Sequence, residues 1–255
     1  MLSPFIRKLE RFSPLSEAEK QAIQSAPLRL WQVASHQDIV SDRDRLAEVH
    51  LIVNGFACRY KLLGDGRRQI TAFLIAGDFC DLSGLLMHQM DFGVAALGYS
   101  TTLAVISHER LMGILEKHPR LAFGLWRDTM IDAAIYRQWL INIGRRSAYA
   151  RTAHLLCEIW LRMQAVGLTR DGFFELPMTQ AEIGDALGLS TVHVNRTLQQ
   201  LRADSLIEFK SNVVRVLDWQ RLETSGEFDP SYLQIAPELM VSPAAGNAPR
   251  SGVRP

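Results

Sequence analysis

One stretch of the chain, residues 190–202, carries side chains that are suited to reading the edges of nucleic-acid bases. Arg196 could bind guanine through two hydrogen bonds, and Val192 could contact the methyl group of thymine. Asn195 or Gln199 could bind adenine or a phosphate. The predicted DNA-contacting set is Ser190, Thr191, Val192, His193, Asn195, Arg196 and Gln199.

Two short helices must position these side chains. Thr179 and Glu182 form a capping box that opens the first helix, and Gly188 is suited to its left-handed C-cap. Ser190 caps the second helix, so Ser190 and Thr191 at its N-terminus are placed for phosphate contacts. Helices joined by a glycine turn predict a helix-turn-helix, whose second helix fits a major groove about 12 Å wide. The inward stripe of that second helix is Val194, Leu198 and Leu201.

The charge pattern of this region agrees with nucleic-acid binding. Residues 190–202 contain two Arg and no Asp or Glu, so phosphates would meet no repulsive charge. The alternative is an amphipathic helix pair whose polar face is only solvated. Segments 206–209 and 213–217, separated by Ser211-Asn212, predict a β-hairpin that would form a wing. Together the caps, the turn, the charge and the hairpin favour a winged helix-turn-helix that binds DNA.

The remaining chain is predicted to be an all-β domain followed by a long helix. Short apolar runs are separated by turn residues, among them Asn54-Gly55 between strands expected at 49–53 and 56–62. The expected fold class is α+β, with an N-terminal jelly-roll-like β-roll, a long dimerisation helix and a C-terminal winged helix-turn-helix domain. The predicted divisions are 1–27 (helical lead-in), 28–117 (β-roll), 118–145 (dimerisation helix and hinge), 146–222 (winged helix-turn-helix) and 223–255 (mostly flexible tail).

The long helix carries more apolar surface than one contact needs. One stripe follows a heptad seam, and Ile131, Ile135 and Trp139 form a neighbouring stripe. The surplus predicts a second partner, most simply the same helix of another subunit, and the alternative is a helix buried within its own chain. The predicted dimerisation residues are Phe123, Trp126, Met130, Ala133 and Leu140.

Composition excludes several function classes. Lys plus Arg total 28 and Asp plus Glu total 27, so the chain as a whole is no polyanion binder and any DNA contact must be local. No run approaches the roughly 18 apolar residues that span a bilayer. The order of apolar and basic residues at the N-terminus does not fit a signal peptide. We therefore expect a cytoplasmic protein with no membrane partner.

The cysteines and motifs indicate neither a metal site nor an enzyme. Cys58, Cys80 and Cys157 are scattered and odd in number, so they predict buried thiols, with no disulfide framework and no metal. No GxSxG, HExxH or GxxxxGK[ST] motif occurs, and no cofactor is predicted. A β-barrel enzyme fused to a DNA-binding module remains an alternative.

With these features in place, the sequence resembles the Crp/Fnr family of bacterial transcription regulators from about residue 28 to residue 222. The resemblance is carried by the order of elements, by the turn Gly77-Asp78-Phe79 and by the segment 188–198, Gly-Leu-Ser-Thr-Val-His-Val-Asn-Arg-Thr-Leu. It implies a homodimer on a near-palindromic operator, with half-sites about one helical turn apart, an effector sensed in the β-roll, and RNA polymerase as a partner. By position, Thr191, Val192 and Arg196 look like the base-contacting set.

The resemblance also bears on the effector. In cyclic-nucleotide-binding members, a Gly-Glu pair and an Arg-Ser pair hold the ribose and the cyclic phosphate, and Asp81-Leu82 and Phe92-Gly93 correspond to them here. Because the arginine is missing and Asp81 would repel a phosphate, cyclic AMP in the usual pose is not expected. An unidentified small hydrophobic effector could bind nearby, or the same residues could be core. The candidate effector set is Phe73, Phe79, Cys80, Asp81, Leu82 and Phe92.

Two further alternatives concern sensing. Three scattered cysteines do not favour an iron–sulfur cluster. Cys80 and His88 could bind haem, and the alternative is that both residues have ordinary structural roles. The β-roll could also only support the dimer, which would make the protein an effector-independent regulator.

Overall fold

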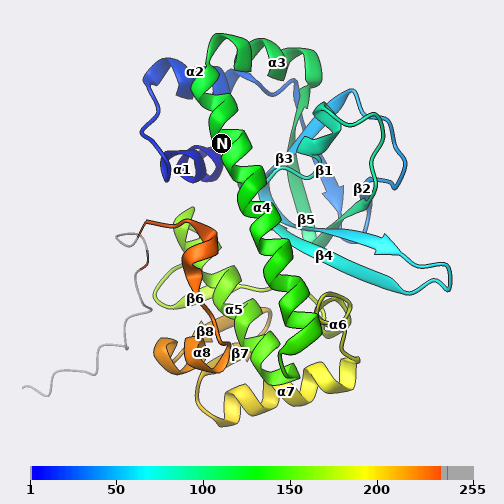
Figure 1. Cartoon of the computed structure of the whole chain (residues 1–255), viewed down its shortest axis with the longest axis vertical. Helices are drawn as coiled ribbons and strands as arrows, with labels where there is room; N and C mark the ends of the chain where they lie inside the picture. Colours follow the sequence, from blue (N-terminus) through cyan, green and yellow to red (C-terminus); the bar gives the residue numbers. More distant parts are fainter. Residues whose placement is uncertain (1, 237–239, 241–255) are drawn as a thin grey trace, which may run out of the picture.

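A computed structural model describes residues 2–236 and residue 240 of the chain. Helix α4 (Pro119–Arg145) runs from the top of the molecule to the bottom in Figure 1. The N-terminal helices and a β-roll lie along its upper half, and a second domain surrounds its lower half. The predicted order of β-roll, long helix and helix-turn-helix is therefore confirmed.

A helical lead-in precedes the β-roll, as predicted, and it consists of two short helices. They are α1 (Ser3–Glu10) and α2 (Glu17–Ser25), and a capping box between Ser16 and Glu19 opens α2. Phe5 of α1 packs edge-to-face on Phe79, with the ring centroids 5.3 Å apart. The lead-in thus completes the apolar core between the β-roll and α4.

The β-roll is antiparallel, with strand order β1-β5-β3-β4 and β2 paired with β5. Its two longest strands are continuous, so the prediction of separate strands at 49–53 and 56–62 is wrong. At Asn54-Gly55 the chain makes a bulge in β3 instead of a turn, because Gly55 adopts φ +94° while its neighbours remain paired with β5. The strands are β1 (Arg29–Ala34), β2 (Asp38–Val40), β3 (Glu48–Leu62), β4 (Arg68–Ile75) and β5 (Gly93–Ser107), with the 3-10 helix η1 (Leu82–Leu85) before β5.

A helix that the sequence analysis did not predict, α3 (His108–Lys117), joins the β-roll to α4. Ser107 caps it by accepting a hydrogen bond from the backbone N–H of Arg110. The second domain begins with α5 (Ala148–Ala165), which Ser147 caps by accepting a hydrogen bond from the backbone N–H of Ala150. The elements that follow are β6 (Phe173–Glu175), α6 (Gln180–Leu187), α7 (Thr191–Ala203), β7 (Ile207–Lys210), β8 (Val213–Val216), α8 (Trp219–Ser225) and η2 (Pro230–Leu233).

The prediction of a mostly flexible tail from residue 223 is wrong for its first part. Residues 223–235 finish α8 and form η2, and Phe228, Leu233 and Ile235 are buried. The Tyr232 ring stacks on His154 of α5, with the centroids 6.0 Å apart. Apolar residues at irregular spacing therefore anchor this segment to α5. Most of the remaining predicted tail, 237–239 and 241–255, lies outside the described residues.

Candidate nucleic-acid interface and dimer seam

The two helices of the predicted helix-turn-helix begin and end where the sequence indicates. Thr179 and Glu182 form the capping box of α6, with each side chain bonded to the other residue's backbone N–H. Gly188 occupies the left-handed region at φ +64° and ends α6. Ser190 accepts a hydrogen bond from the His193 N–H and caps α7. Local sequence thus fixes where the two helices begin and where the first one ends.

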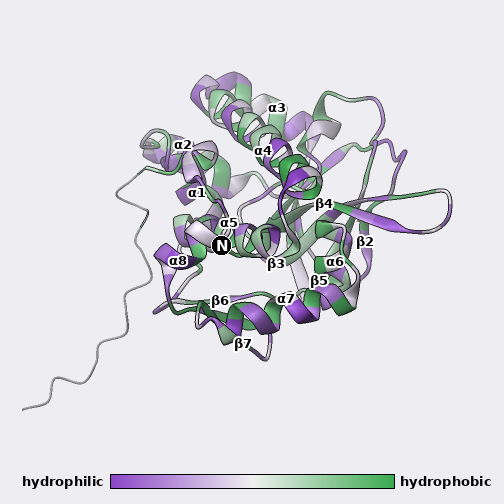
Figure 2. Cartoon of the chain, turned by 60° about the horizontal axis from the view of Figure 1, so that its bottom comes forward, coloured by the Kyte–Doolittle hydropathy of each residue, from purple (hydrophilic) through white to green (hydrophobic). Residues whose placement is uncertain are grey.

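Helix α7 presents one face to the core and one to solvent. Its inward stripe, Val194, Leu198 and Leu201, is buried against α5 and α6. The helix lies along the bottom of the molecule in Figure 1, with no element below it, and Figure 2 shows that it carries both hydrophilic and hydrophobic residues. An exposed helix of this kind is free to enter a groove of DNA.

Six of the seven predicted contact residues share this exposure. Val192 is 79% exposed, and Arg196 makes no ion pair with a described residue. Asn195 differs, because it is half-buried and donates a hydrogen bond to Gln180 Oε1 at 3.2 Å. The exposed set is Ser190, Thr191, Val192, His193, Arg196 and Gln199.

The predicted wing is present as the hairpin of β7 and β8. Ser211 and Asn212 form its tip with φ values of +51° and +62°, which is the conformation that a two-residue hairpin turn prefers. Asn212 also donates a hydrogen bond to the Tyr99 hydroxyl of the β-roll at 3.3 Å. The wing therefore touches the β-roll domain of the same chain.

The long helix separates its two apolar stripes. One stripe, Ile131, Ile135 and Trp139, is buried within the chain. For this stripe the structure agrees with the alternative of a helix buried within its own chain. Four residues of the predicted dimer seam are instead 52% to 73% exposed, and Ala133 is half-buried. The exposed four are Phe123, Trp126, Met130 and Leu140.

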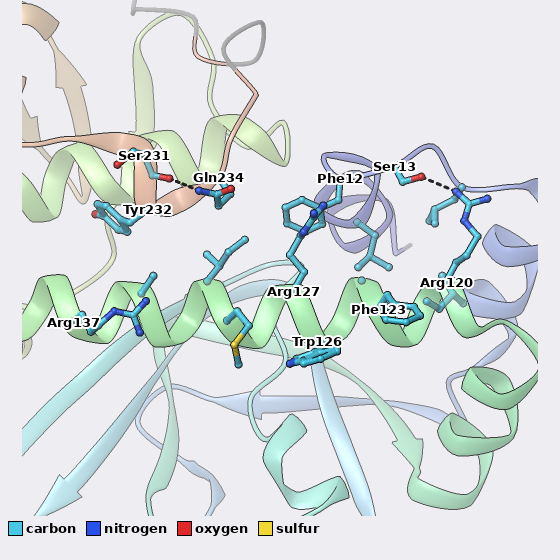
Figure 3. A pocket seen from close by; sticks show the side chains of 17 residues that line it. Phe12, Ser13, Arg120, Phe123, Trp126, Arg127, Arg137, Ser231, Tyr232 and Gln234 are labelled. Carbon is cyan, nitrogen blue, oxygen red and sulfur yellow. Dashed lines mark hydrogen bonds between the residues drawn. The ribbon is translucent and has the colours of Figure 1, made fainter.

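A groove of about 800 Å³ lies beside the upper part of this seam. Figure 3 shows Phe123 and Trp126 on α4, with Phe12 from the α1–α2 connection and Tyr232 from η2 on the opposite side. The groove thus adjoins the exposed apolar side chains of the seam.

The six candidate effector residues do not surround one cavity. Phe73 packs on Trp139 with the ring centroids 5.6 Å apart, whereas Phe79 lies with Phe5 in a different cluster. The cavity that Phe79 lines measures only about 20 Å³, which is room for about one water molecule. Cys80 and Phe92 belong to a third cluster in the interior of the β-roll, and Leu82 packs beside the Phe79 cluster. The arrangement agrees with the alternative that these residues are core.

Two buried polar groups occupy the region where the resemblance would place a cyclic nucleotide. Asp81 is fully buried and accepts hydrogen bonds from the His50 backbone N–H at 2.7 Å and from His50 Nδ1 at 2.6 Å. Arg59 donates to Asp132 of α4 at 2.9 Å and to the carbonyls of Cys80 and Phe79. Both charged side chains therefore already have protein partners.

The thiols and possible metal ligands give no sign of a cofactor site. Burial, together with the charge of Asp81, raises the pKa of Cys80 well above its ordinary value, so this thiol is a poor nucleophile and ligand. Cys80 is buried, while His88 is exposed on the loop that follows. Within residues 2–236 and at 240, no group of three or more His, Cys, Asp or Glu side chains is placed to hold a metal ion.

The fold and the exposed face of α7 define a class of protein, a transcription regulator with a winged helix-turn-helix. The sequence model of the Crp-like helix-turn-helix domain matches residues 150–225, and that of the cyclic nucleotide-binding domain matches residues 30–118. The chain belongs to the Crp/Fnr family of transcription regulators, and the predicted resemblance is confirmed.

Curated relatives agree with this assignment. The transcriptional activator protein FnrL of Cereibacter sphaeroides is 30% identical over 207 residues, which cover 78% of this chain and 81% of FnrL. The transcriptional activatory protein AadR of Rhodopseudomonas palustris is 29% identical over 189 residues, 73% of this chain and 77% of AadR. These relatives are regulators and not enzymes, in agreement with the prediction that the chain is no enzyme.

A solved structure also matches. FixK2 from Bradyrhizobium japonicum has 27% sequence identity and a TM-score of 0.70, covering 77% of this chain and 96% of FixK2. None of the helices in the described part of the chain is both long and apolar enough to cross a membrane.

Sequence reasoning missed one residue that contacts α7, Gln180. It is the first residue of α6 and touches α7 through Asn195. Its polar type next to the Thr179 cap was the available signal, but its contact with α7 spans 15 positions and depends on how the two helices cross.

Proposed function

We propose that the protein is a homodimeric transcription activator that reads a near-palindromic operator with its two α7 helices. The observation that carries this proposal is the exposed, carboxylate-free face of α7, on which Arg196 has no ion-pair partner among the described residues. The guanine edges and the phosphates of a duplex would supply hydrogen-bond acceptors for the Arg196 guanidinium.

The dimer is proposed to form through the seam on α4. Four large apolar side chains at heptad spacing are exposed in the single chain, and pairing with the same helix of a second copy would cover them. A two-fold axis along α4 would relate the two α7 helices, so the half-sites are expected about 34 Å apart.

Activation is proposed because FnrL and AadR, to which the chain is similar, are both named as activators. An activator acts through RNA polymerase, so RNA polymerase is the proposed protein partner, and the cytoplasm is the proposed compartment.

Regulation by a small molecule other than cyclic AMP in the usual pose is proposed for the β-roll. The buried Asp81 supports the exclusion of cyclic AMP in that pose, since a carboxylate at that position would repel the cyclic phosphate. The second candidate is an effector-independent regulator. It is favoured because five of the six candidate effector residues divide among three clusters and do not line one cavity.

Selection of binding sites from random duplexes with the purified full chain tests the function. The expected result for the wild-type protein is one enriched near-palindrome. In Arg196→Ala, the base preference at one position of each half-site is expected to be lost. Enrichment of no sequence would contradict DNA reading, and enrichment of single half-sites would contradict the dimer. Repeating the selection with cell metabolites, beside a thermal-shift screen, separates the two candidates, because only a sensing protein gains both stability and a changed affinity.

A further inference from the structure

The β-roll and the helix-turn-helix of one chain touch at helix α6. Figure 1 shows α6 directly below β4, and the two elements pack against each other. Arg68, the first residue of β4, forms an ion pair with Asp185 of α6, with Nε and Oδ2 2.9 Å apart. The next residue, Gln69, donates a hydrogen bond to the carbonyl of Ala186 at 3.3 Å. Two consecutive residues of the β-roll therefore hold two consecutive residues of α6.

The segment before α6 and the wing also contact the β-roll. Gly98 of β5 adopts φ +73°, and a Cβ at this position would lie 2.8 Å from the Cβ of Pro177. The wing tip reaches the same strand through the hydrogen bond from Asn212 to the Tyr99 hydroxyl. Both parts of the winged helix-turn-helix, the helix pair and the wing, thus rest on the β-roll.

The β-roll holds the Arg68 guanidinium in place for its contact with Asp185. The guanidinium carbon lies over the Tyr60 ring, 5.9 Å from its centroid, and the Tyr60 hydroxyl donates a hydrogen bond to Asp38 at 2.8 Å. The Arg68 and Asp185 side chains are 27% and 33% exposed, so water screens their attraction only in part. The pair therefore contributes to the docking of α6 on the β-roll.

The docking of α6 decides where the recognition helix lies, because α6 and α7 pack against each other. Only Arg146 and Ser147 connect α4 to α5, so the covalent link by itself leaves the second domain free to tilt. In the proposed dimer, the two-fold axis runs along α4, and the distance between the two α7 helices depends on this tilt. Half-sites at one fixed spacing can be read together only at one tilt.

We propose that Arg68 and Asp185 are positioning residues, which hold the second domain at the tilt that sets the spacing of the two half-sites. The pair acts through α6 on α7 and does not itself touch the duplex. The inference rests on the proposed homodimer and its near-palindromic operator. It gives the β-roll a part in operator choice that needs no small molecule.

The test uses the full chain and the operator that wild-type protein selects, together with duplexes in which one base pair is inserted or deleted between the half-sites. Each such change moves one half-site by about 3.4 Å along the duplex and about 35° around it. Wild-type protein is expected to bind the altered duplexes at least about ten-fold more weakly. The ratio of the two affinities measures the spacing preference.

Arg68→Glu and Asp185→Arg are each expected to weaken binding to the selected operator by about five- to twenty-five-fold. One partly exposed ion pair changes an equilibrium by up to about five-fold, and the bound dimer holds two pairs. The spacing preference of each variant is expected to be at least about three-fold smaller than that of wild type, because a freely tilting domain can reach a displaced half-site. Loss of a contact with DNA would weaken binding to all spacings equally.

The double variant Arg68→Glu/Asp185→Arg restores the pair with its charges exchanged, so it should recover most of the affinity and of the spacing preference. Arg67→Glu is the matched control, since it makes the same charge change one position earlier. Arg67 pairs with Asp65 inside the hairpin of β3 and β4, with Nε and Oδ2 2.7 Å apart, and this variant should keep the wild-type spacing preference.

Three results would overturn the proposal: a wild-type spacing preference in either single variant, no recovery in the double variant, or an equal loss of preference in Arg67→Glu. Melting temperatures check the fold, and if a charge-reversed variant is unfolded, Arg68→Gln takes its place with the same expected direction. If wild-type protein selects no operator, or selects single half-sites, the proposed function itself fails, which is a different outcome from any of these.

Discussion

Arg162 of α5 donates to Asp78 of the β-roll at 2.8 Å, and both side chains are buried. Asp78 belongs to the turn that carries part of the family resemblance, and it also binds Lys8 of α1 at 2.6 Å. Burial alone would raise the pKa of Asp78, but Lys8 and Arg162 hold it well below the ordinary value. One ionised carboxylate thus joins the N-terminal helix, the β-roll and the DNA-binding domain.

Removing one partner of this cluster should be strongly destabilising. Arg162→Met leaves Asp78 with one cation in a buried site. It also removes the cation that contacts Glu158 at 3.3 Å, so that this buried carboxyl keeps only its hydrogen bonds from Trp139 and Tyr232 among the described residues. We expect the free energy of unfolding to fall by about 3–5 kcal/mol, as measured by chemical denaturation. Arg170→Met is the matched control, since the Arg170–Asp171 pair is exposed and should change stability by less than about 1 kcal/mol. Equal effects of the two substitutions would contradict a structural role for the cluster.

The seam on α4 gives a second prediction. Trp126→Glu places a charge where a second copy of the helix is proposed to pack, so we expect monomers and much weaker operator binding, measured by light scattering and by titration of labelled duplex. Leu86→Glu is the control, because Leu86 is an apolar residue that is 82% exposed, against 63% for Trp126, and lies on the loop after η1, far from the seam in the chain. A dimeric Trp126→Glu protein would show that another surface holds the subunits together.

Elements whose signals are local could be predicted from the sequence. The caps at Ser16, Thr179, Ser190 and the glycine at 188 decide helix ends within a few residues, and the structure has each of them. Asn54-Gly55 has the composition of a hairpin turn, but pairing of the flanking residues with β5 makes it a bulge. The difference lies in contacts with a strand about 40 positions away, which periodicity does not encode.

In the candidate site, too, features set by local sequence could be predicted, and features set by contacts between elements could not. Periodicity of α7 identifies its exposed face, because burial there depends on one helix packing on its neighbours. It does not reveal that Asn195 is held by Gln180, since that contact depends on the crossing of two helices. Five of the six candidate effector residues divide among three clusters although they are close in sequence. They lie in β4, in the turn after it, in η1 and in the loop before β5, and these segments pack against different parts of the chain.

A histidine in α5 predicts a pH dependence of stability. Burial, and secondarily the charge of Arg146, lowers the pKa of His154 from 6.5 to about 4. The folded protein therefore resists protonation that the unfolded chain accepts below pH 6.5. Stability from the neutral ring is fully present above pH 6.5 and is lost as the pH falls toward 4, by about 2–3 kcal/mol.

The His154 contribution is measured as a difference between two proteins. Unfolding free energies of wild type and His154→Gln are compared at steps between pH 7 and pH 4, so that other titrating groups cancel. Among these is Asp128, whose pKa burial raises to about 6 against the pull of Lys8, and which acts in the opposite direction. The gap between the two proteins should narrow as the pH falls, and a gap that stays constant would contradict a neutral buried His154.

The bulge in β3 allows backbone strain to be separated from steric conflict. Gly55 and Gly66 both have positive φ, +94° and +84°, so alanine at either position pays the conformational cost of about 1 kcal/mol. A Cβ at Gly55 would also lie 2.6 Å from the backbone oxygen of Ser100, whereas a Cβ at Gly66 would have no atom within 4 Å. Gly55→Ala should therefore lower the unfolding free energy by at least about 1 kcal/mol more than Gly66→Ala in parallel denaturant titrations. Equal losses would mean that β5 moves aside without cost and that the bulge does not constrain the sheet.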